Sequence, residues 1–138
     1  MSESRGLRNN NPLNIRKSNI KYNGEVASDD KSFKKFSSLA YGYRAAFRIL
    51  KTYYFRYNLI TISAIINRWA PTNENDTSSY ISTVSNKTGI PKSKALRWGS
   101  EEFVPIVAAM SYVENGVAAD MNAVKEGWLL SKQTDDEK

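Results

Sequence analysis

The chain has 138 residues, of which 41% are hydrophobic and 25% charged, values typical of one globular domain and unlike those of disordered or membrane-spanning proteins. It contains no Cys and no His, which excludes disulfides, thiolate nucleophiles, imidazole bases and most transition-metal sites, so we expect neither metal nor cofactor. The net charge of +6 is concentrated in residues 1–58, where twelve Lys and Arg accompany four Asp and Glu, a balance that suits an anionic polymer or serves solubility alone.

The first third of the chain predicts two or three short strands with tight turns. Short alternating or aromatic stretches occupy residues 13–16, 20–22 and 33–36, and they are separated by Asn23-Gly24 and by a polar segment at 28–30. The N-terminus lacks the apolar run of a signal peptide, so we expect synthesis in the cytoplasm and another route to any extracellular target.

From Leu39 the hydrophobic period becomes helical. Aromatic and aliphatic residues at three- and four-residue steps predict a helix over 39–58, followed by helices from the Thr61 cap to 69, from 76 or 77 to 88, from about 100 to 115, and over 120–130. Residues 91–99 predict a basic loop. These elements indicate an α+β, mostly helical domain over residues 1–132 with a flexible tail at 133–138, and no run long enough to enter a membrane.

One acidic residue interrupts the apolar stripe of the helix predicted over 100–115. Glu114 follows Met110 by four residues and Val107 by seven, so helical geometry places its carboxyl on the apolar face. Burial there would raise its pKa and let it donate a proton to a leaving oxygen, as a glycosidase acid must. The alternative is a boundary residue that reaches solvent or pairs with an Arg.

Three regions of the sequence, two of them made of several short segments, carry a resemblance to known families. Residues 108–116, an apolar run ending Glu114-Asn115-Gly116, resemble the end of the catalytic helix in lytic transglycosylases and flagellar-type glucosaminidases. Residues 11–16, 22–24 and 33–38 are similar to the β-hairpin region of the glucosaminidases, and Trp69-Ala70-Pro71 with residues 76–81 to a later stretch of them. The order is rotated here, which implies a circularly permuted lysozyme-like fold with a small N-terminal hairpin sheet.

Residues 5–116 also resemble a group of small phage-associated virion proteins. The shared features are the start Arg-Gly-Leu-Arg-Asn-Asn-Asn-Pro and the later Trp-Ala-Pro followed by Glu-Asn-Asp-Thr. The resemblance implies a lysozyme-like or structural protein that acts at the bacterial cell wall or within a virion, with peptidoglycan and phage particle components as the expected partners. The oligomeric state is left open.

Several residues are candidates for the remaining roles in such an enzyme. A second carboxylate is required by most glycosidases but not by a lytic transglycosylase, whose substrate supplies the other groups. Glu25, Asp29 or Asp30 near the hairpin and Glu74 in a loop are the candidates, although Glu25 suits a solvated strand and Glu74 merely precedes a helix cap. The candidates for sugar binding are amides and aromatic rings, namely Asn10, Asn11, Asn14, Tyr41, Trp69 and Tyr80; the amides equally suit turns and the rings a core.

Two functions from different classes therefore compete. The first is a muramidase or lytic transglycosylase that cleaves peptidoglycan glycan strands with Glu114 as general acid and base. The second is a non-enzymatic virion structural or cell-wall-binding protein of the same fold. Nucleic-acid binding is disfavoured because the chain has no recognised motif and no long basic run.

Overall fold

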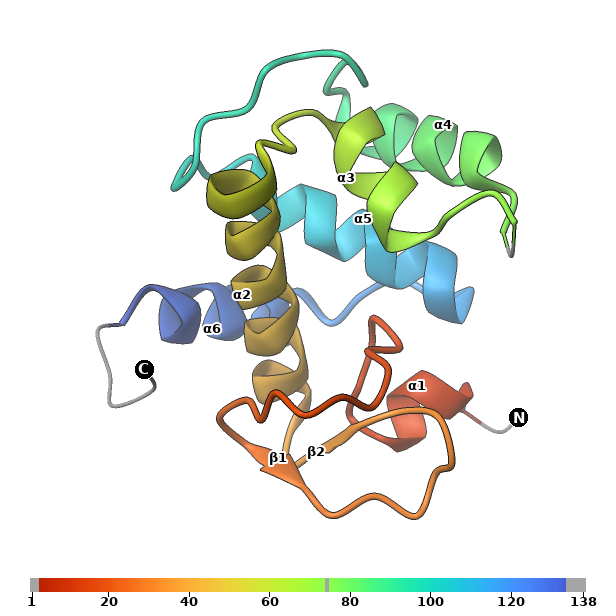
Figure 1. Ribbon diagram of the computed structural model, residues 1–138, viewed down its shortest axis with the longest axis vertical. Helices are drawn as coiled ribbons and strands as arrows, with labels where there is room; N and C mark the ends of the chain where they lie inside the picture. Colours follow the sequence, from red (N-terminus) through yellow and green to blue (C-terminus); the bar gives the residue numbers. More distant parts are fainter. Residues whose placement is uncertain (1–2, 74, 134–138) are drawn as a thin grey trace.

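A long helix connects the two ends of the molecule, with the N-terminal hairpin region at one end and a group of helices at the other (Figure 1). The structure is a computed structural model that describes residues 3–73 and 75–133. This helix, α2 (Leu39–Tyr57), begins where the Ser38 hydroxyl accepts a hydrogen bond from the Tyr41 amide, and it ends at Asn58 in the left-handed conformation.

The remaining helices follow the predicted pattern closely. Their bounds are α3 (Ile62–Trp69), α4 (Thr77–Thr88), α5 (Phe103–Asn115) and α6 (Met121–Lys132). The side chains of Thr61, Asp76 and Asp120 cap α3, α4 and α6, and Gly116 ends α5 with a positive φ of 74°. The observed elements thus confirm the predicted mostly helical α+β class, and local capping and apolar spacing explain where the helices begin and end.

The hydrophobic core surrounds α5. Phe103, Ile106, Val107 and Met110 are completely buried on this helix, which lies between α2, α4 and α6 in Figure 1. The close crossing of α6 over α2 depends on Gly127, because a Cβ there would lie 2.7 Å from the Cβ of Tyr43. Burial of this kind, and not helix propensity, supplies most of the stability of such helices.

The N-terminal region is more irregular than predicted. It holds a four-residue helix, α1 (Arg5–Arg8), which the sequence analysis missed, and an antiparallel pair of two-residue strands, β1 (Glu25–Val26) and β2 (Lys35–Phe36), with one isolated bridge between Arg16 and Phe33. The strand expected at residues 20–22 is absent. Ile20 is 60% exposed, and its carbonyl accepts a hydrogen bond from the buried Lys34 ammonium instead of a ladder amide.

Candidate functional site

Glu114 lies in the last turn of α5, where that helix faces the N-terminal region. Its side chain is half-buried, and both carboxylate oxygens accept hydrogen bonds from other parts of the chain. Asn14 donates from Nδ2 to Oε1 at 2.8 Å, and Tyr80 donates from its hydroxyl to Oε2 at 3.0 Å. The carboxylate is therefore held in one orientation by two donors.

The Asn14 amide is positioned by a turn that Asn11 organises. Asn11 is completely buried, and its side chain donates to the carbonyls of Ile15 and Lys34 and accepts from the Ile15 amide. Within this turn Asn14 adopts a left-handed conformation, with φ of 54°, which Asn tolerates better than most residues. The turn is joined to α5 because Asn115 donates to the Pro12 carbonyl at 2.8 Å.

Tyr80 reaches Glu114 from α4, whose start is fixed by the Asp76 cap. Its ring belongs to the core and is only 6% exposed. Burial, and then the neighbouring Glu114 charge, raises the pKa of Tyr80 well above its usual value. The hydroxyl consequently stays protonated and acts as a hydrogen-bond donor to the carboxylate.

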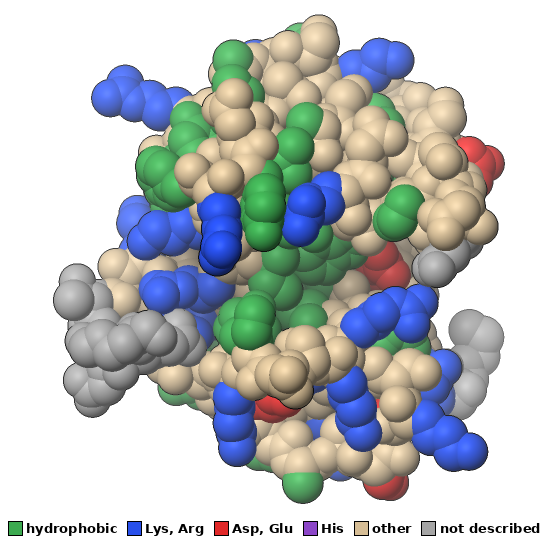
Figure 2. Space-filling view, in the orientation of Figure 1, with side chains coloured by type: hydrophobic (Ala, Val, Ile, Leu, Met, Phe, Trp, Pro, Cys, Tyr) green, Lys and Arg blue, Asp and Glu red, His purple; other side chains and the backbone are tan. Residues whose placement is uncertain are grey.

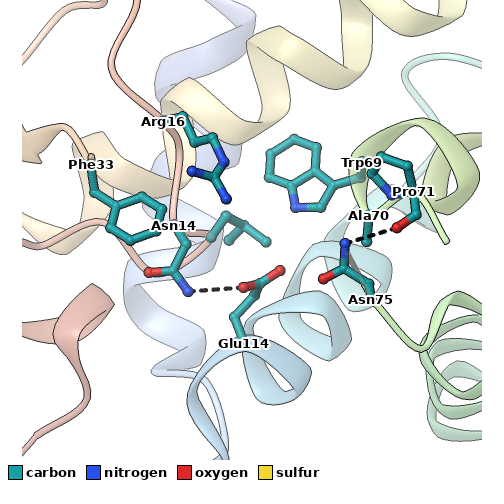
Figure 3. Close-up of a pocket in the computed structure, with 9 residues that line it drawn as sticks. Asn14, Arg16, Phe33, Trp69, Ala70, Pro71, Asn75 and Glu114 are labelled. Carbon is teal, nitrogen blue, oxygen red and sulfur yellow. Dashed lines mark hydrogen bonds between the residues drawn. The ribbon is translucent and has the colours of Figure 1, made fainter. Parts of the chain in front are cut away.

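Glu114 separates two adjoining hollows on the surface. The larger has a volume of about 480 Å³ and is lined by Leu13, Asn14, Arg16, Phe33, Trp69, Ala70, Pro71, Asn75 and Glu114. The smaller, of about 270 Å³, lies on the α4 side of Glu114 and shares Asn75 with the first. In Figure 3 the Glu114 carboxylate points into the larger pocket, with Arg16 and Phe33 on one side and Trp69 and Asn75 on the other.

The larger pocket has a carboxylate in its lining and mostly positive side chains around its margin. Glu114 is the acidic residue among the described residues that line it, and Arg16 is the basic one. Figure 2 shows a hollow across this face with hydrophobic side chains at its base and Lys and Arg side chains around its margin. A ligand would therefore meet an apolar and aromatic base with the Glu114 carboxylate beside it, and positive charge at the rim.

The chain has a clear relative among known proteins. No model of a known protein family matches it. It is 46% identical over 117 residues to Protein P5 of Pseudoalteromonas phage PM2, an alignment that covers 82% of this chain and 72% of the relative. The chain belongs to the family of this phage protein. The predicted kinship with phage proteins is thus confirmed, while the name Protein P5 assigns no activity.

Membrane spans and metal sites are both absent from the part of the chain that the structure describes. No helix there is long and apolar enough to cross a membrane. Within the same residues, no group of three or more acidic side chains is placed to hold a metal ion.

The structure brings together four of the residues predicted from the sequence. Glu114, Asn14 and Trp69 line the larger pocket, and Tyr80 binds Glu114. Trp69 is partly buried and presents its ring to the pocket, as a sugar-stacking residue would (Figure 3). Tyr80 contributes its hydroxyl, whereas its ring is largely in the core.

Other predicted residues lie elsewhere, which corrects the sequence interpretation. The Asn11 amide is buried and bonded to backbone groups, so it shapes the turn and does not face a ligand. Asn10 donates to the Phe36 carbonyl, and Tyr41 packs beneath Gly24 against the core. Neither of them lines a pocket around Glu114. Each side chain serves folding because it satisfies a local group or fills a local space.

Two of the four additional carboxylates suggested for catalysis, Glu25 and Glu74, also have different outcomes. Glu25 accepts two hydrogen bonds from the Lys34 ammonium, at 3.1 and 3.0 Å, in a separate hollow near β1. Lys34 is 1% exposed, so Glu25 neutralises a buried cation and is not part of the Glu114 site. Glu74 lies outside the described residues.

Six pocket residues were not predicted as site residues: the apolar Leu13, Ala70 and Pro71, and the charged, aromatic and amide residues Arg16, Phe33 and Asn75. Arg16 and Phe33 form an isolated bridge in the backbone, and the Arg16 guanidinium lies 5.4 Å from the Phe33 ring. The alternation within residues 13–16 could have indicated that Arg16 shares a face with Asn14. Asn75 donates to the Pro71 carbonyl at 3.0 Å, which is a loop interaction with no signal in hydrophobic spacing.

Proposed function

We propose that this chain cleaves the glycan strands of peptidoglycan, with Glu114 as the general acid and base. The observation that carries the proposal is the arrangement of Glu114 itself, a single carboxylate that is oriented by two donors and lines a pocket with the aromatic residues Phe33 and Trp69. Solvent-exposed helical glutamates are not normally held at both oxygens, whereas a carboxyl group that exchanges protons with a bound substrate benefits from a fixed orientation.

A lysozyme-like fold with permuted chain order is part of this proposal. Its support is that a helix ending in Glu114-Asn115-Gly116 faces the hairpin region across a pocket, although the hairpin comes first in the chain (Figure 1). The hydrogen bond between Asn14 and Glu114 links residues 100 positions apart. A circular permutation would produce such a separation between groups that are closer along the chain in the glucosaminidases.

The chemistry requires one proton to move in each direction. Glu114 in its acid form gives a proton to the glycosidic oxygen as the bond from that oxygen to the sugar C1 breaks. The resulting carboxylate then removes a proton from the group that attacks C1. Attack by water gives a reducing sugar, and attack by the C6 hydroxyl of the same sugar gives an anhydro sugar.

The described carboxylates favour the second of these outcomes. Asp30 is occupied by Arg5, which donates to both of its oxygens, and by the Ser32 and Phe33 amides. Glu25 is paired with Lys34. Asp76 lines the smaller hollow together with Glu114, but its Oδ1 caps α4 by accepting from the Ser79 amide at 3.1 Å. Because these carboxylates are engaged in local structure and the described residues of the larger pocket include no acidic side chain besides Glu114, the proposal assigns the nucleophile and the charge stabilisation to the substrate's own groups.

The test is digestion of purified sacculi by the wild-type protein and by Glu114→Gln. We expect turbidity to fall with the wild type alone, and mass spectrometry of the soluble products to show anhydro ends. Glu101→Gln is the matched control, because Glu101 is exposed just before the same helix. Glu74→Gln tests a further candidate for a second carboxylate: inactivity of this variant, together with reducing ends in the wild-type products, would indicate a two-carboxylate hydrolase.

A second candidate function is a structural or cell-wall-binding role in a phage particle. The kinship with a phage protein favours it, because a virion component needs the fold and the surface but no turnover. Folded wild-type protein that clears no sacculi from several wall types, yet is recovered with phage particles, would support this role over cleavage.

A further inference from the structure

A row of aromatic and arginine side chains extends from the larger pocket along the surface. Trp69 lines the pocket, and the Tyr53 ring lies 6.2 Å from the Trp69 ring in an edge-to-face arrangement. The Arg68 guanidinium lies over both tyrosines, 5.2 Å from the Tyr53 ring and 4.0 Å from the Tyr57 ring. We call these four residues the arginine–tyrosine strip.

The fold fixes the strip in place. Tyr53 and Tyr57 are four residues apart on α2 and so lie on the same face of the helix. Arg68 and Trp69 occupy the last turn of α3, and the Leu59 amide donates to the Tyr53 carbonyl in the short connection between the two helices. The strip is also accessible, since Arg68 is exposed and Tyr57 is 43% exposed.

The opposite side of the pocket repeats this pairing of guanidinium and ring. Arg16 lies over Phe33 at 5.4 Å, and Arg5 approaches the same ring at 4.7 Å. Arg16 and Phe33 both line the larger pocket. Figure 3 shows Arg16 and Phe33 on one side of Glu114 and Trp69 on the other, and Arg68 with its tyrosine rings continues outward from Trp69.

This arrangement distinguishes between two kinds of sugar polymer. An aromatic ring takes the face of a guanidinium, whereas the five N–H donors lie in the plane of the group and suit a carboxylate that binds through both oxygens. A neutral glycan would gain stacking from Trp69 but no ion pairs with arginines at the rim. A glycan that carries acidic side groups would gain both.

We propose that the arginine–tyrosine strip binds the carboxylates of stem peptides attached to the glycan, with Arg68 as the principal contact and Arg16 as its counterpart across the pocket. The substrate class is then a peptide-substituted strand and not a bare glycan. This inference rests on the proposed function, because it assumes that a glycan strand occupies the Glu114 pocket. Charge complementarity and continuity with that pocket through Trp69 are its grounds.

The test is binding of Glu114→Gln protein, which should hold its substrate without turnover, to three polymers. These are native sacculi, sacculi whose peptide carboxylates have been converted to amides, and chitin. We expect binding to native sacculi to be about tenfold tighter than to the other two. Adding Arg68→Gln should remove most of that preference, and Arg68→Lys should restore only part of it.

Lys125→Gln provides the matched control, because it removes one positive charge from an exposed position on α6. The inference is wrong if Arg68→Gln and Lys125→Gln bind native sacculi equally, if amidation of the sacculi has no effect, or if no polymer is bound. It is also wrong if duplex DNA competes fully for the strip. Melting temperatures confirm that each variant is folded.

These outcomes separate the inference from the proposed function. If Glu114→Gln loses wall clearing and Arg68→Gln does not change binding, the proposed cleavage is supported and the proposed role of the strip in binding carboxylates is wrong. If binding depends on Arg68 and on the peptide carboxylates but the wild type clears no walls, the role of the strip is supported and the proposed cleavage is wrong.

Discussion

Replacement of Tyr80 by Phe isolates the hydrogen bond that orients Glu114. The substitution keeps the buried ring and removes only the hydroxyl, which lies 3.0 Å from Glu114 Oε2. A hydrogen bond to a charged group contributes about 1.5–3 kcal/mol, and water entering from the neighbouring pockets should recover part of this. At about 1.4 kcal/mol for each factor of ten, we expect kcat to fall roughly ten- to a hundredfold.

The assay is the initial rate of cleavage of solubilised glycan strands as a function of their concentration. We expect KM to change much less than kcat, because the shape of the pocket walls is retained. Tyr54→Phe is the matched control: its hydroxyl donates to the Leu96 carbonyl at 3.0 Å, remote from Glu114 in the chain and outside both pockets. It removes one tyrosine hydroxyl at a similar cost in stability.

The kcat of Tyr80→Phe, compared with the wild type and with Tyr54→Phe, decides whether the hydrogen bond to Glu114 matters. If Tyr80→Phe keeps kcat within about twofold of the wild type while Glu114→Gln is inactive, orientation through Oε2 is not important for the reaction. An equal loss of kcat in Tyr80→Phe and Tyr54→Phe would instead show that general stability, and not the Glu114 contact, accounts for the effect.

Three further predictions concern other parts of the site and its support. Asn14→Gly should lower kcat as Tyr80→Phe does with little loss of stability, whereas Asn14→Ala should cost a further ~1 kcal/mol in thermal melts because of the positive φ; equal melting would contradict this. The Arg5 hydrogen bonds hold the pKa of Asp30 well below its usual value, so its stabilisation exists above about pH 4 and is lost as the pH falls further. Asp30→Asn should thus lower Tm at pH 7, with a difference that shrinks in acid; a constant difference would refute it. In Gly42→Ala the new Cβ would lie 2.1 Å from the Asn10 carbonyl oxygen, so calorimetry should show a loss of at least ~2 kcal/mol, compared with almost none for exposed Thr52→Ala.

The helical part of the fold could be predicted because its signals are local. The apolar spacing along α2 and α5, the Asp76 cap and the glycine at 116 all act within a few residues of the helix they define. Tertiary packing then agreed with what each segment favours alone. For this reason the predicted helix ends differ from the observed ones by only a few residues.

The N-terminal region could be predicted less well because long-range polar contacts organise it. Buried Asn11 joins the carbonyls of Ile15 and Lys34, and the Lys34 ammonium binds carbonyls at 18 and 20 together with Glu25. A buried lysine in the stretch Phe33-Lys34-Lys35-Phe36 has the same sequence pattern as an exposed one. The strand predicted at 20–22 failed for that reason.

The site shows the same division between local and long-range information. A carboxylate on the apolar face of a helix is a conflict visible in the sequence, and together with the resemblance of residues 108–116 to known catalytic helices it makes Glu114 a candidate. The partners that resolve it lie 100 and 34 residues away, at Asn14 and Tyr80, on a turn and on another helix. The hydrophobic spacing shows which buried polar group requires hydrogen-bond partners. Which donors supply those bonds is determined only by the packing of the folded chain. Tyr80 illustrates the difference: its aromatic ring suggested sugar stacking, and its burial instead makes it a proton-retaining donor to the carboxylate.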